Sequence, residues 1–221
     1  MKLAVKGVLA VSLAVSMACL GGCASVPTAM SPEAGVIAQA KGLAARGQRE
    51  QSAAMLRIAA MSNPDSRVLR AAYGKSLIGV GDLAEAESVL AKAHTPDNPD
   101  PSVLAAQGVV AAQKGDQRMA QEYFRRALNL RPGDAKVQAN LALSLAMEGK
   151  PGEAEQVARA AAGSPAADAR VRQTLALVLV LEGKDREAAE VFQKDLPPDR
   201  ASANVKMLQQ MRAGGAKKRS A

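Results

Sequence analysis

The sequence predicts an all-α protein made of five copies of one helical hairpin, followed by one more helix that caps the stack. The first observation is a glycine that returns every 34 residues without drift, at Gly47, Gly81, Gly115, Gly149 and Gly183. The second is composition: 48% of the 221 residues are hydrophobic, yet there are only two Tyr, two Phe and no Trp. A core of that kind must be filled by Ala, Leu, Val and Met, which suits closely packed helices better than strands.

Small residues recur at fixed places in each unit when the repeated glycine is numbered as position fifteen. Position eight is Ala40, Gly74, Gly108, Ala142 and Ala176, and position twenty is Ser52, Ala86, Ala120, Ala154 and Ala188. We expect these small side chains to let the two helices of each hairpin approach closely, beside larger apolar residues at positions eleven and twenty-four. We expect the glycine at position fifteen to supply the left-handed backbone conformation that ends each first helix.

Both ends of the repeated region carry helix signals. Ser31-Pro32-Glu33 supplies an N-cap, a proline at the first helical position and an acid in the first turn. Pro197-Pro198-Asp199 ends the fifth unit, and we expect the helix after it to cover the last repeat with its apolar face. That face consists of Val205, Leu208 and Met211. The predicted segments are five hairpins at 31–66, 67–100, 101–134, 135–168 and 169–198, a capping helix at 199–213 and a basic disordered tail at 214–221.

This pattern resembles the tetratricopeptide repeat (TPR), an antiparallel helix pair that stacks into a right-handed superhelix. The resemblance covers residues 33–200 and is closest over residues 101–132. The aromatic residue common at position four of that family is absent, and the position holds Val36, Arg70, Leu104, Gln138 and Arg172. A coiled coil is excluded, because no heptad persists and a glycine interrupts the pattern every 34 residues.

The first 30 residues have the features of an export signal followed by a tether. A basic start is followed by a 13-residue apolar stretch, Val8–Leu20, which is the length of a signal-peptide core and too short to span a membrane. Leu20-Gly21-Gly22-Cys23 then resembles the lipobox of bacterial lipoproteins. The resemblance implies a signal peptide at 1–22 and a lipidated cysteine with its tether at 23–30. In that family Ala24 after the cysteine implies the outer membrane. The alternative is a plain signal peptide in which Cys23 is incidental.

Charge and composition argue against several functional classes. The net charge is +8, but Lys2 and Lys6 lie in the predicted signal and the last ten residues hold four cations and no acid. The body is therefore close to neutral, unlike a nucleic-acid-binding domain. There is one His, His94, and the only cysteines are Cys19 and Cys23. We therefore expect no metal, no cofactor, no small-molecule substrate and no enzymatic activity. The basic tail is either a solubilising end or a contact to anionic lipid.

The resemblance to TPR proteins implies a groove lined by the first helix of each unit. Some TPR proteins place a Lys/Asn clamp for a peptide carboxylate there. In this sequence the clamp is essentially missing, apart from Lys41, Lys75, Lys136 and Asn140. The third to fifth units offer apolar residues instead: Val109, Leu143, Met147, Leu177, Val180 and Leu181. The hypothesis is an apolar groove for an extended or amphipathic segment. The alternative is that some of these side chains pack between units or hold the cap.

A second resemblance concerns the end of the chain. Residues 168–184, Asp195-Leu196-Pro197-Pro198 and residues 203–208 resemble the C-terminal end of the TadD family, the TPR lipoproteins of tight-adherence (Tad/Flp) pilus machines. The resemblance implies a scaffold or pilotin, lipid-anchored at the periplasmic face of the outer membrane. Its partners would be protein components of the pilus machine, with the secretin as one candidate. Lys206-Met207 departs from that family's pattern. The alternative is an adaptor for outer-membrane protein insertion or for organising peptidoglycan enzymes.

Overall fold

The computed structural model describes residues 31–219, with side chains described as far as residue 213. Within that part the chain forms helices joined by turns, without a named strand. The helices are α1 (Pro32–Ala45), α2 (Arg49–Ser62), α3 (Arg67–Val80), α4 (Leu83–Ala91), α5 (Pro101–Gln113), α6 (Gln117–Leu130), α7 (Ala135–Met147), α8 (Pro151–Ala162), α9 (Ala169–Leu181), α10 (Asp185–Phe192) and α11 (Pro198–Arg219). None of these helices is both long enough and apolar enough to cross a membrane. The predicted signal peptide, Cys23 and the tether lie outside the described residues.

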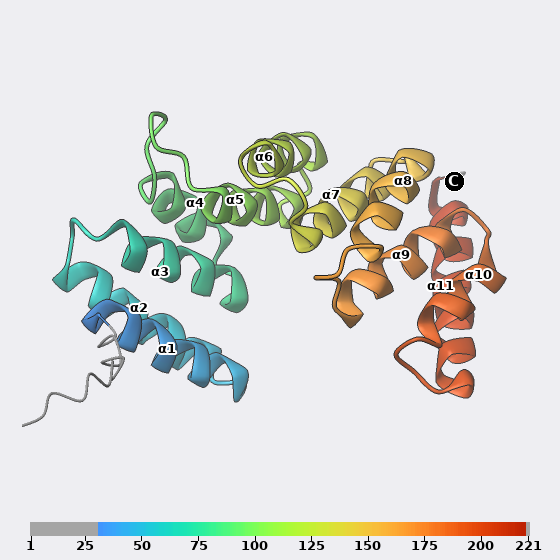
Figure 1. The fold of residues 1–221 in the computed structure, drawn as a ribbon, viewed down its shortest axis with the longest axis horizontal. Coiled ribbons are helices and arrows are strands. Elements are labelled where there is room, and N and C mark those ends of the chain that lie inside the picture. Colours follow the sequence, from blue (N-terminus) through green and yellow to red (C-terminus); the bar gives the residue numbers. More distant parts are fainter. Residues whose placement is uncertain (1–30, 220–221) are drawn as a thin grey trace, which may run out of the picture. The chain divides into compact units, whose positions relative to one another are not determined.

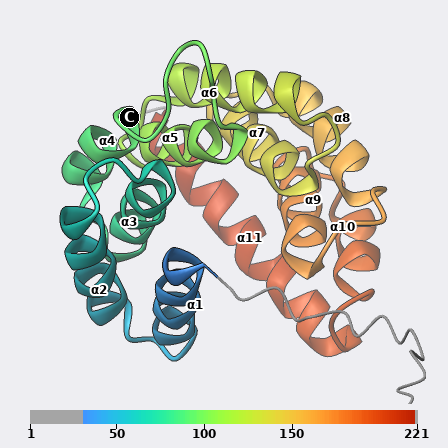
Figure 2. The same ribbon diagram turned by 60° about the vertical axis from the view of Figure 1, so that its left-hand side comes forward.

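The first ten helices form five hairpins that stack in sequence order (Figure 1). Each helix packs mainly on its neighbours in the chain, and successive first helices also touch: α1 with α3, α3 with α5, α5 with α7 and α7 with α9. Figure 2 shows that α3, α5, α7 and α9 line the inner side of the curved stack, with α4, α6, α8 and α10 outside. The all-α class and the hairpin stack predicted from the sequence are confirmed.

Local chemistry determines where the helices begin and end. The side chains of Ser66, Asp100, Asp134 and Asp168 accept hydrogen bonds from backbone N–H groups in the first turns of α3, α5, α7 and α9. These bonds satisfy donors that a helix start would otherwise leave unpaired. The five glycines at position fifteen have φ between 81° and 89°. Because a residue with a Cβ is strained in that conformation, glycine is the residue suited to these turns.

The small residues at position eight lie where the two helices of a hairpin meet. A Cβ placed on Gly108 would lie 2.5 Å from Cε1 of Phe124, and one on Gly74 would lie 2.7 Å from Cδ2 of Leu90. Ala142 is fully buried at the same position in the fourth unit, and Ala154 is fully buried at position twenty. Large residues at position twenty-four therefore occupy the space that small residues at position eight leave open.

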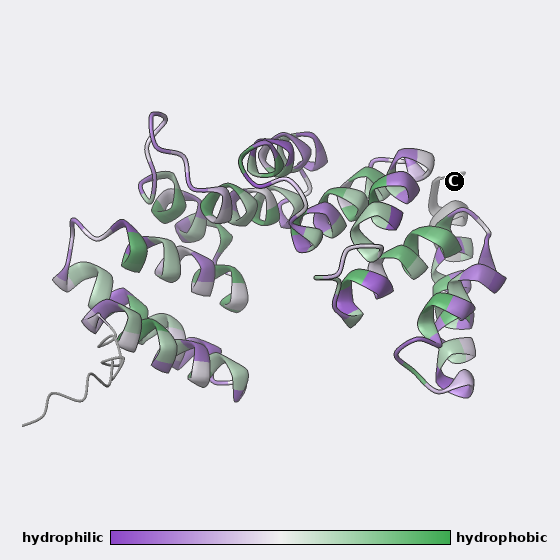
Figure 3. Cartoon of the chain, viewed as in Figure 1, coloured by the Kyte–Doolittle hydropathy of each residue, from purple (hydrophilic) through white to green (hydrophobic). Residues whose placement is uncertain are grey.

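The core runs through the stack in two main clusters joined at α5. Leu104 of α5 belongs to the cluster that extends to α11, whereas Val103 and Val110 belong to the cluster that extends back to α1. The hydropathy colouring in Figure 3 shows hydrophobic residues along α5, α7 and α9. These inner helices are flanked by other helices on several sides, so a large share of their surface is buried.

Arginine at position four joins the two ends of a hairpin in the second and fifth units. The guanidinium of Arg172 on α9 makes two hydrogen bonds with the carboxylate of Asp195 after α10, at 2.7 and 2.5 Å. Arg70 on α3 donates to the carbonyl of Lys92 after α4, at 2.6 Å. Asp195 stands at position twenty-seven, where the other four units have alanine. It is the ion-pair partner of Arg172, which replaces the usual aromatic residue at position four. Hydrogen bonding from Arg172 is the main factor that holds the pKa of Asp195 below its ordinary value.

The last helix is longer than the sequence predicts. The backbone is helical from Pro198 to Arg219, so the expectation of a disordered tail over 214–221 is wrong as far as residue 219. Gly214 and Gly215 each disfavour this helix by about 1 kcal/mol, but residues 214–219 contain no proline that would end it. Within this helix Ala201 and Val205 are buried against the last repeat, whereas Met211 is 65% exposed. The expectation that Met211 faces the core is therefore wrong.

Candidate binding groove

Position nine divides the inner face of the stack into two chemically different halves. The residue is Lys41 in the first unit and Lys75 in the second, and both line one hollow between α1, α3 and the start of α5. In the next three units the position holds Val109, Leu143 and Leu177. At position nine the inner face is therefore cationic in the first two units (the N-terminal half) and apolar in the last three (the C-terminal half).

The hollow in the N-terminal half has a volume of about 370 Å³ and mixed walls. Its apolar wall includes Ile37, Leu56, Val68, Ala71 and Ala72. Val68 is 59% exposed, which is unusual for a β-branched side chain in an otherwise packed region. Lys41, Lys75 and Ser102 provide the polar groups. A hollow of this composition can hold an apolar side chain beside an anionic group.

The ammonium of Lys75 is held at the mouth of the hollow. It donates to the hydroxyl of Ser102 at 2.9 Å, and that hydroxyl lies 2.6 Å from Oδ1 of Asp100. Burial of the ammonium lowers the pKa of Lys75, and the charges of Lys41 and Arg131 lower it further, while Asp100 opposes them. Lys41 and Arg131 are therefore close enough to Lys75 to repel its ammonium.

A second hollow of about 430 Å³ adjoins the first, because both are lined by Val68 and Asp100. Arg67 and Arg131 contribute two more cations to its wall. His94 also lines it, and its Nδ1 atom is buried without a hydrogen-bond partner among the described residues. The two hollows together form a continuous cationic surface with apolar walls.

The six residues predicted to line the apolar groove have different environments. Leu143 and Leu177 are half-buried and lie outside the buried core clusters, and Met147 and Leu181 are 61% and 37% exposed. Val109 is half-buried and packs against the core. Val180 is fully buried, so its placement in the groove is wrong. It is a core residue of α9, and its carbonyl accepts a hydrogen bond from Arg212 of α11.

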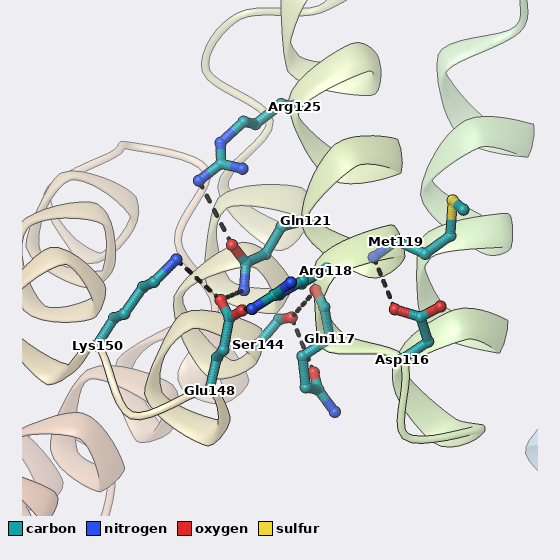
Figure 4. Close-up of polar contacts among 9 residues, drawn as sticks. All are labelled: Asp116, Gln117, Arg118, Met119, Gln121, Arg125, Ser144, Glu148 and Lys150. Carbon is teal, nitrogen blue, oxygen red and sulfur yellow. Dashed lines mark hydrogen bonds and ion pairs between the residues drawn. The ribbon is translucent and has the colours of Figure 1, made fainter.

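Polar joints connect successive units on another face. Glu148, at the end of α7, accepts hydrogen bonds from Gln121 at 2.8 Å and Arg118 at 3.1 Å, both on α6, and pairs with Lys150 at 3.0 Å (Figure 4). The bond from Gln121 and the pairing with Lys150, helped by Arg118, lower the pKa of Glu148 to about 2. A surface hollow at this place is lined by three cations, Arg118, Arg125 and Lys150. Two of them, Arg118 and Lys150, are already paired with Glu148, which indicates a joint between units rather than a ligand site.

The same joint recurs along the stack. Position twenty-one of one unit faces position fourteen of the next: Glu87 pairs with Lys114 at 2.5 Å, and Gln121 donates to Glu148. In the last joint Lys184 contacts both Glu155 and Glu182. The first joint holds Ala53 and Val80 at these positions instead.

Residues 31–213 contain no cluster of three side chains that would suit a metal ion.

Residues 101–134 match the family model of the tetratricopeptide repeat, over the unit that resembles the repeat most closely. The chain folds as a tetratricopeptide-repeat superhelix. A fold of this kind is typically a non-enzymatic scaffold for protein–protein interaction. No curated protein matches the sequence.

Solved TPR structures resemble this chain along most of its length. A thermophilic TPR protein of Thermus thermophilus is 17% identical, with a TM-score of 0.68, and the match covers 82% of this chain and 98% of that one. PilF of Pseudomonas aeruginosa is 21% identical, with a TM-score of 0.65 and coverage of 85% and 86%. YrrB, a TPR protein described as having an unusual peptide-binding site, is 18% identical, with a TM-score of 0.51 and coverage of 83% and 90%. At these identities the likeness concerns the fold.

The hollow around Lys75 is the feature that reasoning from the sequence missed. Lys41 and Lys75 stand out in the sequence as cations at position nine, but only as remnants of a missing clamp. The contact between Lys75 and Ser102 spans 27 residues and joins two units. A repeat pattern reports which residues face inward, but it does not report which of them enclose a hollow.

Proposed function

We propose that this chain is a protein-interaction scaffold or pilotin of the Tad/Flp pilus machine, anchored by lipid to the periplasmic face of the outer membrane. The observation that carries the scaffold role is the inner face of the TPR stack, where Leu143 and Leu177 remain accessible outside the core. YrrB has the same fold and is described as having a peptide-binding site, which is compatible with this role. The pilus assignment is supported by the resemblance of residues 168–208 to the TadD family.

The test of the pilus assignment is the double variant Leu143→Glu with Leu177→Glu. Two charges on the apolar half should abolish docking of an apolar segment, since such contacts depend on a few anchor residues worth about 1–3 kcal/mol each. The matched control is Ile58→Glu with Met119→Glu, because these exposed apolar residues lie on the outer helices α2 and α6. We expect the groove variant, but not the control, to lose surface pili and adherence.

Circular dichroism and membrane fractionation establish that both variants are folded and anchored. Normal pili in a folded, anchored groove variant, or in a strain without this chain, would contradict the pilus assignment. The adaptor role in outer-membrane protein insertion or peptidoglycan-enzyme organisation would then be the better proposal, because it needs the same groove and the same anchor.

Anchoring makes a separate prediction at Cys23. Changing Cys23 to Ser should abolish labelling by radioactive palmitate and leave the precursor uncut, because the thiol is the group that would carry the lipid. Each buried methylene contributes about 0.8 kcal/mol to membrane binding, so two or three acyl chains would anchor the protein stably. Cys19→Ser is the matched control and should change neither result. Continued labelling of the Cys23 variant would mean that the chain is not lipidated at this residue.

A further inference from the structure

We infer that the two adjoining hollows of the first units bind an acidic segment of a partner protein, with an apolar side chain seated between α1 and α3. This inference rests on the proposed scaffold function and specifies the chemistry of one partner. It concerns a part of the inner face different from the apolar half that contains Leu143 and Leu177.

The first argument is the excess of cations. Lys41, Lys75, Arg67 and Arg131 line the two hollows, and Asp100 is the acid that lines them. Within the described residues Lys41 and Arg67 have no ion pair, and Arg131 has a 3.7 Å contact with Asp134. An anionic ligand would therefore meet several cations that the fold does not neutralise.

The second argument is that Asp100 is already engaged as a helix cap. Its Oδ1 atom accepts the backbone N–H of Ser102 at 2.6 Å and that of Val103 at 3.2 Å. Burial raises the pKa of Asp100, but the hydrogen bonds from Ser102 and Val103 outweigh that effect and lower it. The carboxylate is thus held at the start of α5, and its single charge is set against the four cations that line the two hollows.

The third argument identifies the ligand as a peptide. The first hollow has an apolar wall of Ile37, Leu56 and Val68, and its volume of about 370 Å³ is ample for a leucine or phenylalanine side chain. A free phosphate or a sugar–phosphate backbone would leave that wall in contact with water. A chain segment that carries Asp or Glu beside an apolar residue satisfies both the wall and the cations.

The experiment uses two fluorescein-labelled peptides, one with alternating Asp and Leu and a twin in which every Asp is Asn. Fluorescence anisotropy with the full chain, purified in mild detergent, should show binding of the Asp peptide that weakens from about 50 mM to about 500 mM salt. The Asn peptide should bind at least about tenfold more weakly. Equal binding of the two peptides, or no binding of either, would overturn the inference.

Variants locate the site. Lys41→Gln with Lys75→Gln should weaken binding of the Asp peptide by about tenfold or more, because both changes remove charge at the hollow. Lys194→Gln with Lys206→Gln changes the net charge equally at exposed residues of the C-terminal part, away from the two hollows, and should leave binding unchanged. Val68→Ser should also weaken binding, since it removes part of the apolar wall. Equal weakening by both lysine pairs would mean that only the overall charge is sensed, and the inference would fail.

Competition distinguishes a peptide site from other anion sites. Neither phosphatidylglycerol vesicles nor an oligodeoxythymidine should displace the Asp peptide at equal charge concentration. Displacement of the Asp peptide from the unmodified chain by either competitor would mean that the site takes a lipid or a nucleic acid, and it would overturn the inference. The pilus assay tests Leu143 and Leu177, whereas the peptide assay tests Lys41 and Lys75. A failed peptide assay therefore leaves the proposed function standing.

Discussion

At Gly108 the backbone of α5 lies against the ring of Phe124 from α6. An added Cβ would be 2.5 Å from Cε1 and 2.7 Å from Cδ1 of that ring. The ring is 1% exposed and belongs to the buried core, so it has little room to move. Close approach of the two helices, rather than backbone conformation, therefore requires glycine at this position.

Gly108→Ala should lower the free energy of unfolding by about 1–3 kcal/mol, because overpacking outweighs the gain in helix propensity. Gly79→Ala is the matched control: Gly79 is also helical, but nothing lies within 4 Å of its added Cβ. That change should be neutral or stabilise the protein by up to about 1 kcal/mol. Urea unfolding followed by circular dichroism measures both. Equal effects of the two substitutions would contradict the packing described for position eight.

At the scale of elements, the joints between units combine apolar packing with paired charges. Glu148 connects the end of α7 to α6, and Glu155 of α8 contacts Lys184, which precedes α10. The carboxylate of Glu155 also pairs with Arg159, and the pKa of Glu155 is lowered to about 2. Both carboxylates are therefore more stable as anions in the folded chain than in the unfolded chain.

This difference predicts how stability depends on pH. Because the pKa of Glu148 falls from 4.5 to about 2 on folding, its contribution is fully present above pH 4.5 and is lost as the pH falls toward 2. Glu148→Gln should therefore destabilise the protein at pH 7 and make its stability fall less steeply between pH 5 and pH 2. Chemical unfolding at a series of pH values measures this. Glu122→Gln, an exposed change on α6, should leave the slope as it is. An unchanged slope in the Glu148 variant would argue against the joint.

At the scale of the whole repeat region, burial increases away from the first unit. α1 buries a single residue, Ala40, whereas α7 buries seven. In a stack of this kind each unit is stabilised mainly by its neighbours, and α1 has neighbours on one side of the described chain. The last unit differs, because α11 covers it and buries Ala201 and Val205.

Hydrogen exchange followed by mass spectrometry should therefore show a gradient of protection. Amides of α1 should exchange at least about tenfold faster than those of α7 and α9, because opening an end unit exposes little apolar surface. Changing Val205 to Asp should raise exchange in α9 and α10 without affecting α3. Equal protection of α1 and α7 would mean that the stack unfolds as a single cooperative unit.

The sequence by itself was sufficient to predict the fold class, the five units and their register. This succeeded because the information is local and repeated: a glycine every 34 residues marks a turn, and a small residue at position eight marks a helix crossing. Such patterns identify which residues face a neighbour, whatever that neighbour is. The choice of Leu143 and Leu177 needed more than the repeat pattern: it follows from the resemblance to TPR proteins, which implies a groove lined by the first helix of each unit.

The tertiary structure alone decided which inward residues are accessible and which pairs meet. Val180 is buried because α11 packs over the end of α9, and Arg212, 32 residues away, donates to its carbonyl. The hollow at Lys75 is lined by residues of three units, and Ser102 of the third unit lies 2.9 Å from the ammonium. These contacts depend on the angle and spacing between units, which many weak packing interactions set together. A one-dimensional repeat pattern does not contain that angle, so the cationic hollow appears only once the units are stacked.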